Sequence, residues 1–144
     1  MLKITCPFLF ICSLLLLISC DNKISHDPVV KPEFSVSKET VYSEIKNLAK
    51  TEVVWMEGYS FLIDTLNTSL NVQLINPKEL PANKDSIIAT QKRVASRLKS
   101  FLKDGKQFKE YNIIFIRRDT VRRSSGTLTS EEALFDYTFK ESDL

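Results

Sequence analysis

The feature that most constrains the fold is a long stripe of mostly apolar residues at helical spacing. The stripe comprises Ile87, Ile88, Gln91, Val94, Ala95, Leu98, Phe101 and Leu102. Residues three and four apart share one face of a helix, so the pattern predicts an amphipathic helix with one buried face. Lysines and arginines occupy its other faces, and Asn83 or Asp85 can cap its start. A helix with one apolar face needs a second layer to cover that face.

Alternating side chains on both sides of this helix predict that the second layer is a sheet. Residues 59–75 alternate apolar and polar side chains around a turn, which is typical of a β-hairpin. YNIIFI at 111–116 is apolar on both faces and predicts a central strand, and 135–139 alternates again. We expect residues 117–126 to form a polar connection between these last two strands. Residues 52–56 fit either a strand or an extension of a preceding helix.

A second helix is expected from Lys38 to about Lys50, with Ser37 as its N-cap. The predicted order is therefore α-β-β-α-β-β. The simplest fold that satisfies it is α+β: an antiparallel sheet of about four strands with two helices on one face.

The N-terminus has the form of an export signal. Residues 4–19 carry no charge and follow Lys3, but they are shorter than the roughly 20 residues that cross a bilayer. The motif Leu17-Ile18-Ser19-Cys20 resembles the lipobox of bacterial lipoproteins. That resemblance implies that residues 1–19 are a cleaved signal peptide. It also implies that Cys20 carries fatty acyl chains such as palmitate, which hold the protein on a membrane of the cell envelope.

This resemblance also predicts how the rest of the chain is divided. Residues 20–36 are expected to be the lipidated cysteine and a flexible tether that contains Pro28 and Pro32, and residues 37–144 one globular α+β domain. The chain looks like a small lipoprotein of a Gram-negative bacterium, on the outer membrane rather than the inner, facing the periplasm or the cell exterior. Asp21 resembles an inner-membrane retention signal that some lineages ignore, so the choice of membrane stays open.

Charge is unevenly distributed along the chain. Residues 92–123 carry 11 basic and 3 acidic side chains, whereas residues 124–144 carry 1 basic and 5 acidic ones. These segments either complement each other in the fold or create a basic patch for an anionic glycan or protein partner. The candidate anion-binding residues are Arg117, Arg118, Arg122 and Arg123, because guanidinium groups bind carboxylate and phosphate in a forked geometry. The alternative is an exposed hairpin end kept soluble by charge. Nucleic acid is not expected as a partner of an exported protein.

Few residues offer catalytic chemistry. The only histidine, His26, lies in the expected tether, and no cysteine–histidine cluster or closely spaced glycine motif is present. We therefore predict no metal and no cofactor. The acids considered for a carboxylate mechanism are Glu57, Asp64, Glu131 and Glu132, which fit solvated surface acids equally well. The aromatics that fit either a core or a sugar-stacking surface are Trp55, Tyr59, Phe61, Phe135, Tyr137 and Phe139.

Three short triplets of aspartate, hydroxyl residue and aliphatic residue resemble the O-glycan acceptor pattern of some Gram-negative bacteria. Their hydroxyl residues are Thr65, Ser86 and Thr120. The leading hypothesis for function is a non-enzymatic, lipid-anchored binding or adaptor module. The alternatives are an immunity or inhibitor-type lipoprotein that blocks a toxin or a wall-degrading enzyme, and a carboxylate-based glycan hydrolase.

Overall fold

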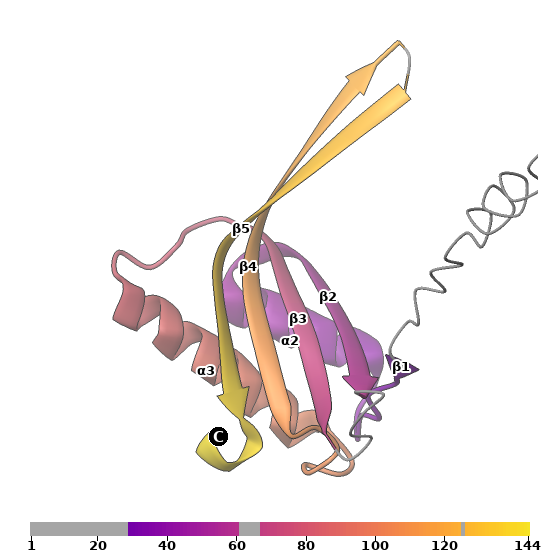
Figure 1. Ribbon diagram of the computed structural model, residues 1–144, viewed down its shortest axis with the longest axis vertical. Helices are drawn as coiled ribbons and strands as arrows, with labels where there is room; N and C mark the ends of the chain where they lie inside the picture. The colour runs from indigo at the N-terminus through magenta and orange to yellow at the C-terminus, as the bar shows by residue number, and fades with distance from the viewer. Residues whose placement is uncertain (1–28, 61–66, 125) are drawn as a thin grey trace, which may run out of the picture.

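Two helices cover one face of a five-stranded sheet in the computed structural model, which describes residues 29–60, 67–124 and 126–144 (Figure 1). The elements in chain order are β1 (Val29–Val30), α2 (Lys38–Ala49), β2 (Thr51–Ser60), β3 (Thr68–Pro77), α3 (Lys84–Phe101), β4 (Glu110–Arg123), β5 (Gly126–Lys140) and the 3-10 helix η2 (Glu141–Asp143). The strands lie in the sheet in the order β1-β2-β3-β4-β5.

The α+β class with two helices is confirmed, but the prediction of four antiparallel strands is wrong. The sheet is mixed, because β3 and β4 are parallel while the other neighbours are antiparallel. Helix α3 carries the chain from the end of β3 back to the start of β4, and such a crossover makes the two strands parallel. The element order also differs from the prediction, since the short strand β1 precedes α2.

Both helices start where their caps predict. The Ser37 side chain accepts a hydrogen bond from the Thr40 backbone N–H at 3.2 Å, and the Asn83 side chain accepts one from the Ser86 N–H at 2.9 Å. Lys50 adopts a left-handed conformation with φ 51° and ends α2. These caps set where each helix begins, and the buried apolar residues of each helix form the face that meets the sheet.

The core lies between the helices and the sheet. Its largest fully buried side chains include Tyr111, Phe108, Phe115, Ile45, Leu70, Leu74 and Leu98. The predicted stripe of α3 provides much of this core, and its one polar member, Gln91, is also buried. The Gln91 side-chain amide donates a hydrogen bond to the Ile113 carbonyl at 2.8 Å, which ties α3 to β4.

The first hairpin begins earlier than the alternation indicated. Strand β2 starts at Thr51, so the ambiguous residues 52–56 are strand, and the strand pairs with β3 from Thr51↔Pro77 to Ser60↔Thr68. The expected hairpin turn lies partly at residues 61–66, outside the described residues.

The expected polar connection at residues 117–126 is wrong. Strands β4 and β5 continue beyond the sheet as a two-stranded ribbon that projects from the molecule (Figure 1). We call residues 117–123 and 126–132 the arm; at about 3.3 Å per residue, seven residues extend about 23 Å. Most of its described side chains are exposed on both faces, so polar residues here do not indicate a loop.

Asn76, at the end of β3, secures the base of the arm. Its side-chain oxygen accepts a hydrogen bond from the Arg118 backbone N–H at 2.8 Å, and its amide donates one to Glu52 at 3.1 Å. Strand β3 has by then ended its pairing with β4 at Ile75↔Ile116. The Asn76 side chain therefore provides a hydrogen-bond acceptor for an N–H of β4 that β3 no longer pairs with.

Residues 29–36, which were expected in the tether, lie along the domain. Strand β1 pairs with the end of β2, and the Ser35 N–H donates to the Phe101 carbonyl at 2.8 Å. The Lys103 N–H donates to the Glu33 carbonyl at 2.9 Å. The start of the described chain is therefore held at the end of the sheet where β2 finishes.

Candidate functional site

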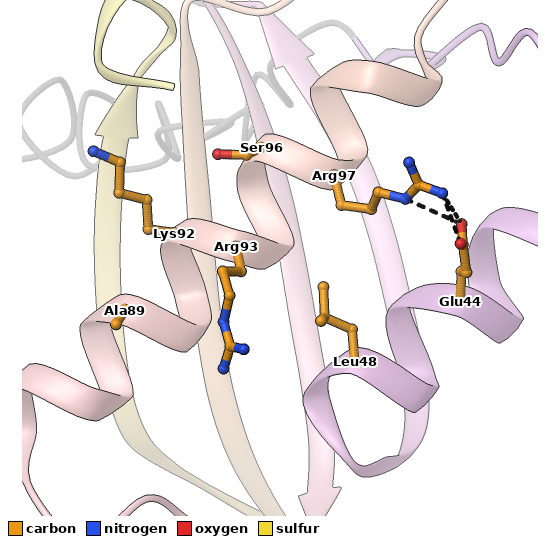
Figure 2. Close-up of a pocket in the computed structure, with 7 residues that line it drawn as sticks. All are labelled: Glu44, Leu48, Ala89, Lys92, Arg93, Ser96 and Arg97. Atoms are coloured by element: carbon orange, nitrogen blue, oxygen red, sulfur yellow. Dashed lines mark hydrogen bonds and ion pairs between the residues drawn. The ribbon is translucent and has the colours of Figure 1, made fainter.

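A groove lies on the outer surface of the helical layer, between α2 and α3. Its volume is about 710 Å³, and Figure 2 shows its seven lining residues. They are Glu44 and Leu48 from α2, with Ala89, Lys92, Arg93, Ser96 and Arg97 from α3. Residues 89, 93 and 97 follow each other at intervals of four, which places them along one side of α3.

An ion pair between Arg97 and Glu44 joins the two helices across this groove. The Arg97 Nη2 atom lies 2.7 Å from Glu44 Oε1, and the Nε atom lies 3.2 Å from Oε2, so the contact is forked (Figure 2). The hydrogen bonds that Arg97 donates to Glu44 raise the pKa of Arg97 above its ordinary value. The guanidinium also stacks over the Phe101 ring at 4.4 Å, so its orientation is set from two sides.

The other two cations of the groove have no carboxylate partner in the described part of the chain. No ion pair within the described residues includes Lys92 or Arg93. Arg93 donates a hydrogen bond to the Thr90 hydroxyl at 3.2 Å, and Lys92 points away from α2 in Figure 2. Three cations and one anion line the groove, which gives it a net charge of +2.

The groove combines this charge with an apolar floor. Leu48 is partly buried and packs against the core, and Ala89 of α3 is the other apolar residue of the lining. A concave apolar surface with a few placed cations is suited to a ligand that has an apolar body and an acidic group. The sequence showed the basic faces of α3, but the groove depends on which helix face lies beside α2, and no local pattern encodes that.

The four arginines proposed for anion binding fall into different surroundings on the arm. Arg117 pairs with Glu132 at 3.4 Å, and Arg118 pairs with Glu131 at 2.6 Å. The Arg122 side chain is exposed, and the side chain of Arg123 lies outside the described residues. The structure therefore does not gather the four into one site, because two of them are matched with acids of the facing strand.

A smaller hollow of about 470 Å³ marks the base of the arm. Arg117, Arg118 and Asp119 line it from β4, and Glu52 lines it from β2. Both acids and cations line this hollow. Its polar walls contrast with the apolar floor of the groove between the helices.

Ion pairs connect the basic middle of the chain to its acidic end. Besides the two arm pairs, Lys99 contacts Glu141 at 2.7 Å, and this contact lowers the pKa of Glu141 below its ordinary value. Much of the charge asymmetry is therefore balanced within the fold. Lys92 and Arg93 belong to the part that these pairs leave unbalanced.

The remaining candidate residues are dispersed. Glu57 accepts a hydrogen bond from the Tyr59 hydroxyl, while Glu131 and Glu132 are engaged by arginine. Among the aromatics, Phe139 is buried in the core, whereas Trp55, Phe135 and Tyr137 are partly exposed. Asp64 and Phe61 lie outside the described residues.

The predicted modification sites are only partly described. Ser86 and Thr120 are exposed, as acceptors of a glycan need to be, whereas Cys20, His26 and Thr65 lie outside the described residues. Within residues 29–60, 67–124 and 126–144, no group of three or more histidine, cysteine, aspartate or glutamate side chains is arranged to hold a metal ion. Neither helix of the described part combines the length and apolar character needed to cross a bilayer.

No protein-family model, curated protein or solved structure matches this chain.

Proposed function

We propose that the protein is a lipid-anchored envelope protein whose domain is a binding or adaptor module for an acidic partner. The anchor is Cys20, and the membrane is the outer one rather than the inner. The lipobox-like motif Leu17-Ile18-Ser19-Cys20 supports the anchor. The groove between α2 and α3 supports the binding module.

One observation carries the choice of site: the groove has an apolar floor and two cations, Lys92 and Arg93, that no acid of the described chain neutralises. An acidic peptide segment or an anionic glycan with an apolar face could pair with these cations and cover Leu48. Such binding weakens as ionic strength rises, because the cations are exposed to solvent.

The binding proposal is tested with charge-reversed variants used as bait in solubilised envelope. Lys92→Glu/Arg93→Glu reverses both free cations of the groove and is expected to lose the partner that the wild type captures at low salt. Lys46→Glu/Lys106→Glu makes the same change in net charge at exposed sites outside the groove and should retain it. Equal capture by both double variants would exclude the groove as the binding site.

The anchor is tested separately by intact mass spectrometry of protein purified from native membranes. The expected mass is that of residues 20–144 plus fatty acyl chains, and Cys20→Ala should abolish both the lipid and membrane retention. A mass that includes residues 1–19 with a free thiol at Cys20 would contradict the anchor.

The projecting arm favours a second candidate function, that of an inhibitor or immunity lipoprotein. A ribbon with both faces exposed and a tip about 23 Å from the sheet can enter the active-site cleft of a toxin or wall-degrading enzyme. Replacing residues 117–132 by an Asn-Gly turn removes the arm and keeps the Ile116↔Ala133 pair as the end of the ribbon. Cells that carry this variant should become as sensitive to competitors as cells without the gene. Unchanged resistance would remove this candidate.

A further inference from the structure

A second groove lies at the free edge of β2, on the side where the described chain begins. Its volume is about 550 Å³, and β1, residues 31–36, β2 and the first turns of α2 enclose it. Strand β1 pairs only with Gly58 and Tyr59, so the rest of this edge of β2 has no neighbouring strand within the described chain. We call this the β2-edge groove.

Exposed apolar side chains surround the β2-edge groove. Val29 is 55% exposed, Val36 is 42% exposed and Trp55 is 38% exposed, so a tryptophan and two valines face solvent on one side of the domain. Val53, two residues from Trp55 on the same strand, is 47% exposed and extends this apolar surface. Monomeric soluble domains seldom expose such a group of large apolar side chains without a use for it.

The polar groups at the rim suit the boundary between water and lipid. Lys31 and Lys38 lie at the groove, and the Lys38 ammonium sits 5.2 Å from the centroid of the Tyr42 ring. Glu57 is the one acid among the lining residues, and the Tyr59 hydroxyl donates a hydrogen bond to it. Tryptophan, tyrosine and lysine together are characteristic of surfaces at lipid headgroup level, because each has an apolar body and a polar end.

The position of this surface in the chain indicates what covers it. Val29 is nine residues after Cys20, and nine extended residues span at most about 30 Å. If acyl chains on Cys20 hold the protein in a bilayer, the groove stays within about 30 Å of the lipid surface. A short link of this kind gives an effective concentration in the millimolar range, so a contact too weak to bind a free domain becomes populated.

We propose that the β2-edge groove and its apolar rim are a membrane-docking surface that rests on the lipid headgroups beside the anchor. This inference rests on the proposed lipidation of Cys20. Trp55 and the exposed valines contact the interface, and Lys31 and Lys38 meet the phosphate groups. Docking orients the domain, because the arm leaves the sheet at the opposite end of the strands from β1. The arm then leads away from the membrane towards a partner.

The sequence contains a single tryptophan, which makes the docking measurable in the native chain. The mature lipidated protein is reconstituted in vesicles of phosphatidylethanolamine and phosphatidylglycerol, with or without bromine atoms on the acyl chains. Contact with the interface should shift the Trp55 emission to shorter wavelength and reduce it about twofold in the brominated vesicles. Val29→Ser/Val36→Ser should lose most of this quenching while it still floats with the vesicles.

Two control variants have their changes on the arm. Val121→Ser/Leu128→Ser removes two apolar side chains that are 50% and 58% exposed, similar to the valines of the groove, and it should leave the quenching unchanged. Trp55→Phe/Leu128→Trp moves the tryptophan to the arm, where emission should be equal in both kinds of vesicle.

The outcomes separate the anchor from the docking surface. A wild-type protein that floats but shows no quenching of Trp55 overturns the docking surface and leaves the anchor standing. Wild-type protein that does not float overturns the anchor and this inference with it. If Trp55 is shielded in native membranes but not quenched in pure lipid vesicles, the surface docks on a protein, and the proposal is also overturned.

Discussion

Residues 110–116 of β4 lie in the sheet beneath the helices, and residues 117–123 lie in the arm, so one strand passes through two different surroundings. Both halves pair with β5 in an antiparallel register, interrupted once by a bulge at Phe115/Ile116. In the first half, Tyr111, Ile113 and Phe115 are buried against the helices. In the second half, the facing pair Val121↔Leu128 is at least half exposed.

Strand pairing and core formation are therefore separable in this chain. The sheet half gains its stability from buried apolar surface, at about 25 cal/mol per Å². Beyond its base, where Asn76 pairs with Arg118, the described part of the arm has cross-strand pairs, which contribute about 0.2–1 kcal/mol each. The bulge comes just before the boundary between the halves, where an extra residue in β5 bends the ribbon as it leaves the sheet.

The largest difference between the two halves is expected when an apolar side chain of each is truncated to alanine. Phe115→Ala should lower the free energy of unfolding by about 3–5 kcal/mol, because it leaves a cavity in the core. Val121→Ala in the arm should change it by less than about 0.5 kcal/mol, since its side chain is already half exposed. Urea unfolding of the two variants measures both values. Equal losses would show that the arm packs against something in solution.

Two glycines, Gly58 in the sheet and Gly126 in the arm, are expected to resist substitution for different reasons. A Cβ atom at Gly58 would clash with the Val30 carbonyl oxygen and lie 2.5 Å from Phe108 Cε1, so Gly58→Ala should cost about 1–3 kcal/mol and displace β1. Gly126 in the turn of the arm has φ 136° and open space around it. Gly126→Ala should therefore cost about 1 kcal/mol through backbone strain alone.

Thermal unfolding of the two alanine variants measures these losses. Amide hydrogen exchange at β1 then distinguishes them, because only Gly58→Ala should accelerate it. Faster exchange at β1 in Gly126→Ala would contradict the view that the arm and the sheet are stabilised independently.

The contrast also explains what the sequence could and could not predict. The helix stripe, the cap at Ser37 and the central strand are local sequence patterns, and each was predicted correctly; for the second helix the sequence left Asn83 and Asp85 as alternative caps, and the structure has Asn83. The arm was missed because its residues are polar on both faces, and polar residues between two strands usually indicate a loop. Its indication is the charge order: arginines at 117 and 118 precede the acids Glu131 and Glu132 by the interval that an extended hairpin requires.

The candidate sites were hidden for a different reason. The parallel pairing of β3 with β4 depends on where α3 packs, and so does the groove between the helices. Lys92 and Arg93 read as ordinary exposed residues of an amphipathic helix until Leu48 and Glu44 of α2 complete the lining of the same groove. A site formed by two segments more than 40 residues apart has no local pattern for a single sequence to display.

Substitution of Tyr111, in the sheet half of β4, is expected to have an intermediate effect on the free energy of unfolding. Its hydroxyl is buried without a hydrogen-bond partner among the described residues. Burial, with the nearby carboxylates Glu141 and Asp104, raises its pKa to about 12. The folded state therefore favours the neutral phenol, and the stability that this provides is complete below about pH 10, the pKa of an unfolded tyrosine, and is lost as pH rises towards 12.

Tyr111→Phe should therefore stabilise the protein by about 1 kcal/mol at neutral pH, since it removes an unpaired buried hydroxyl. It should also flatten the decline in stability between pH 10 and pH 12. Urea unfolding as a function of pH measures both effects. Tyr137→Phe, at a partly exposed tyrosine of β5, is the matched control and should leave the stability at neutral pH unchanged. A steeper decline in Tyr111→Phe than in the wild type would contradict this account.

The smallest expected effect tests what holds the arm together. Arg118 and Glu131 face each other across the ribbon, with a contact of 2.6 Å and side chains that are 34% and 43% exposed. A double-mutant cycle with Arg118→Ala and Glu131→Ala should give a coupling energy of about 0.2–1 kcal/mol, because solvent screens a pair this exposed. The coupling should shrink in 1 M salt, where the Debye length is about 3 Å.

The coupling energy has to be measured from local opening of the arm, because so small a free-energy change cannot be resolved in the unfolding of the whole domain. Hydrogen exchange at the amides of Thr120 and Thr129, which face each other one pair nearer the tip than Asp119↔Ser130, reports local opening of the ribbon. The same cycle at Lys99 and Glu141, an ion pair that is less exposed and lies at the sheet end, should give a larger coupling that salt reduces less. Equal salt dependence at the two pairs would mean that the arm is as shielded from solvent as the sheet. That result would remove the distinction between the arm and the sheet.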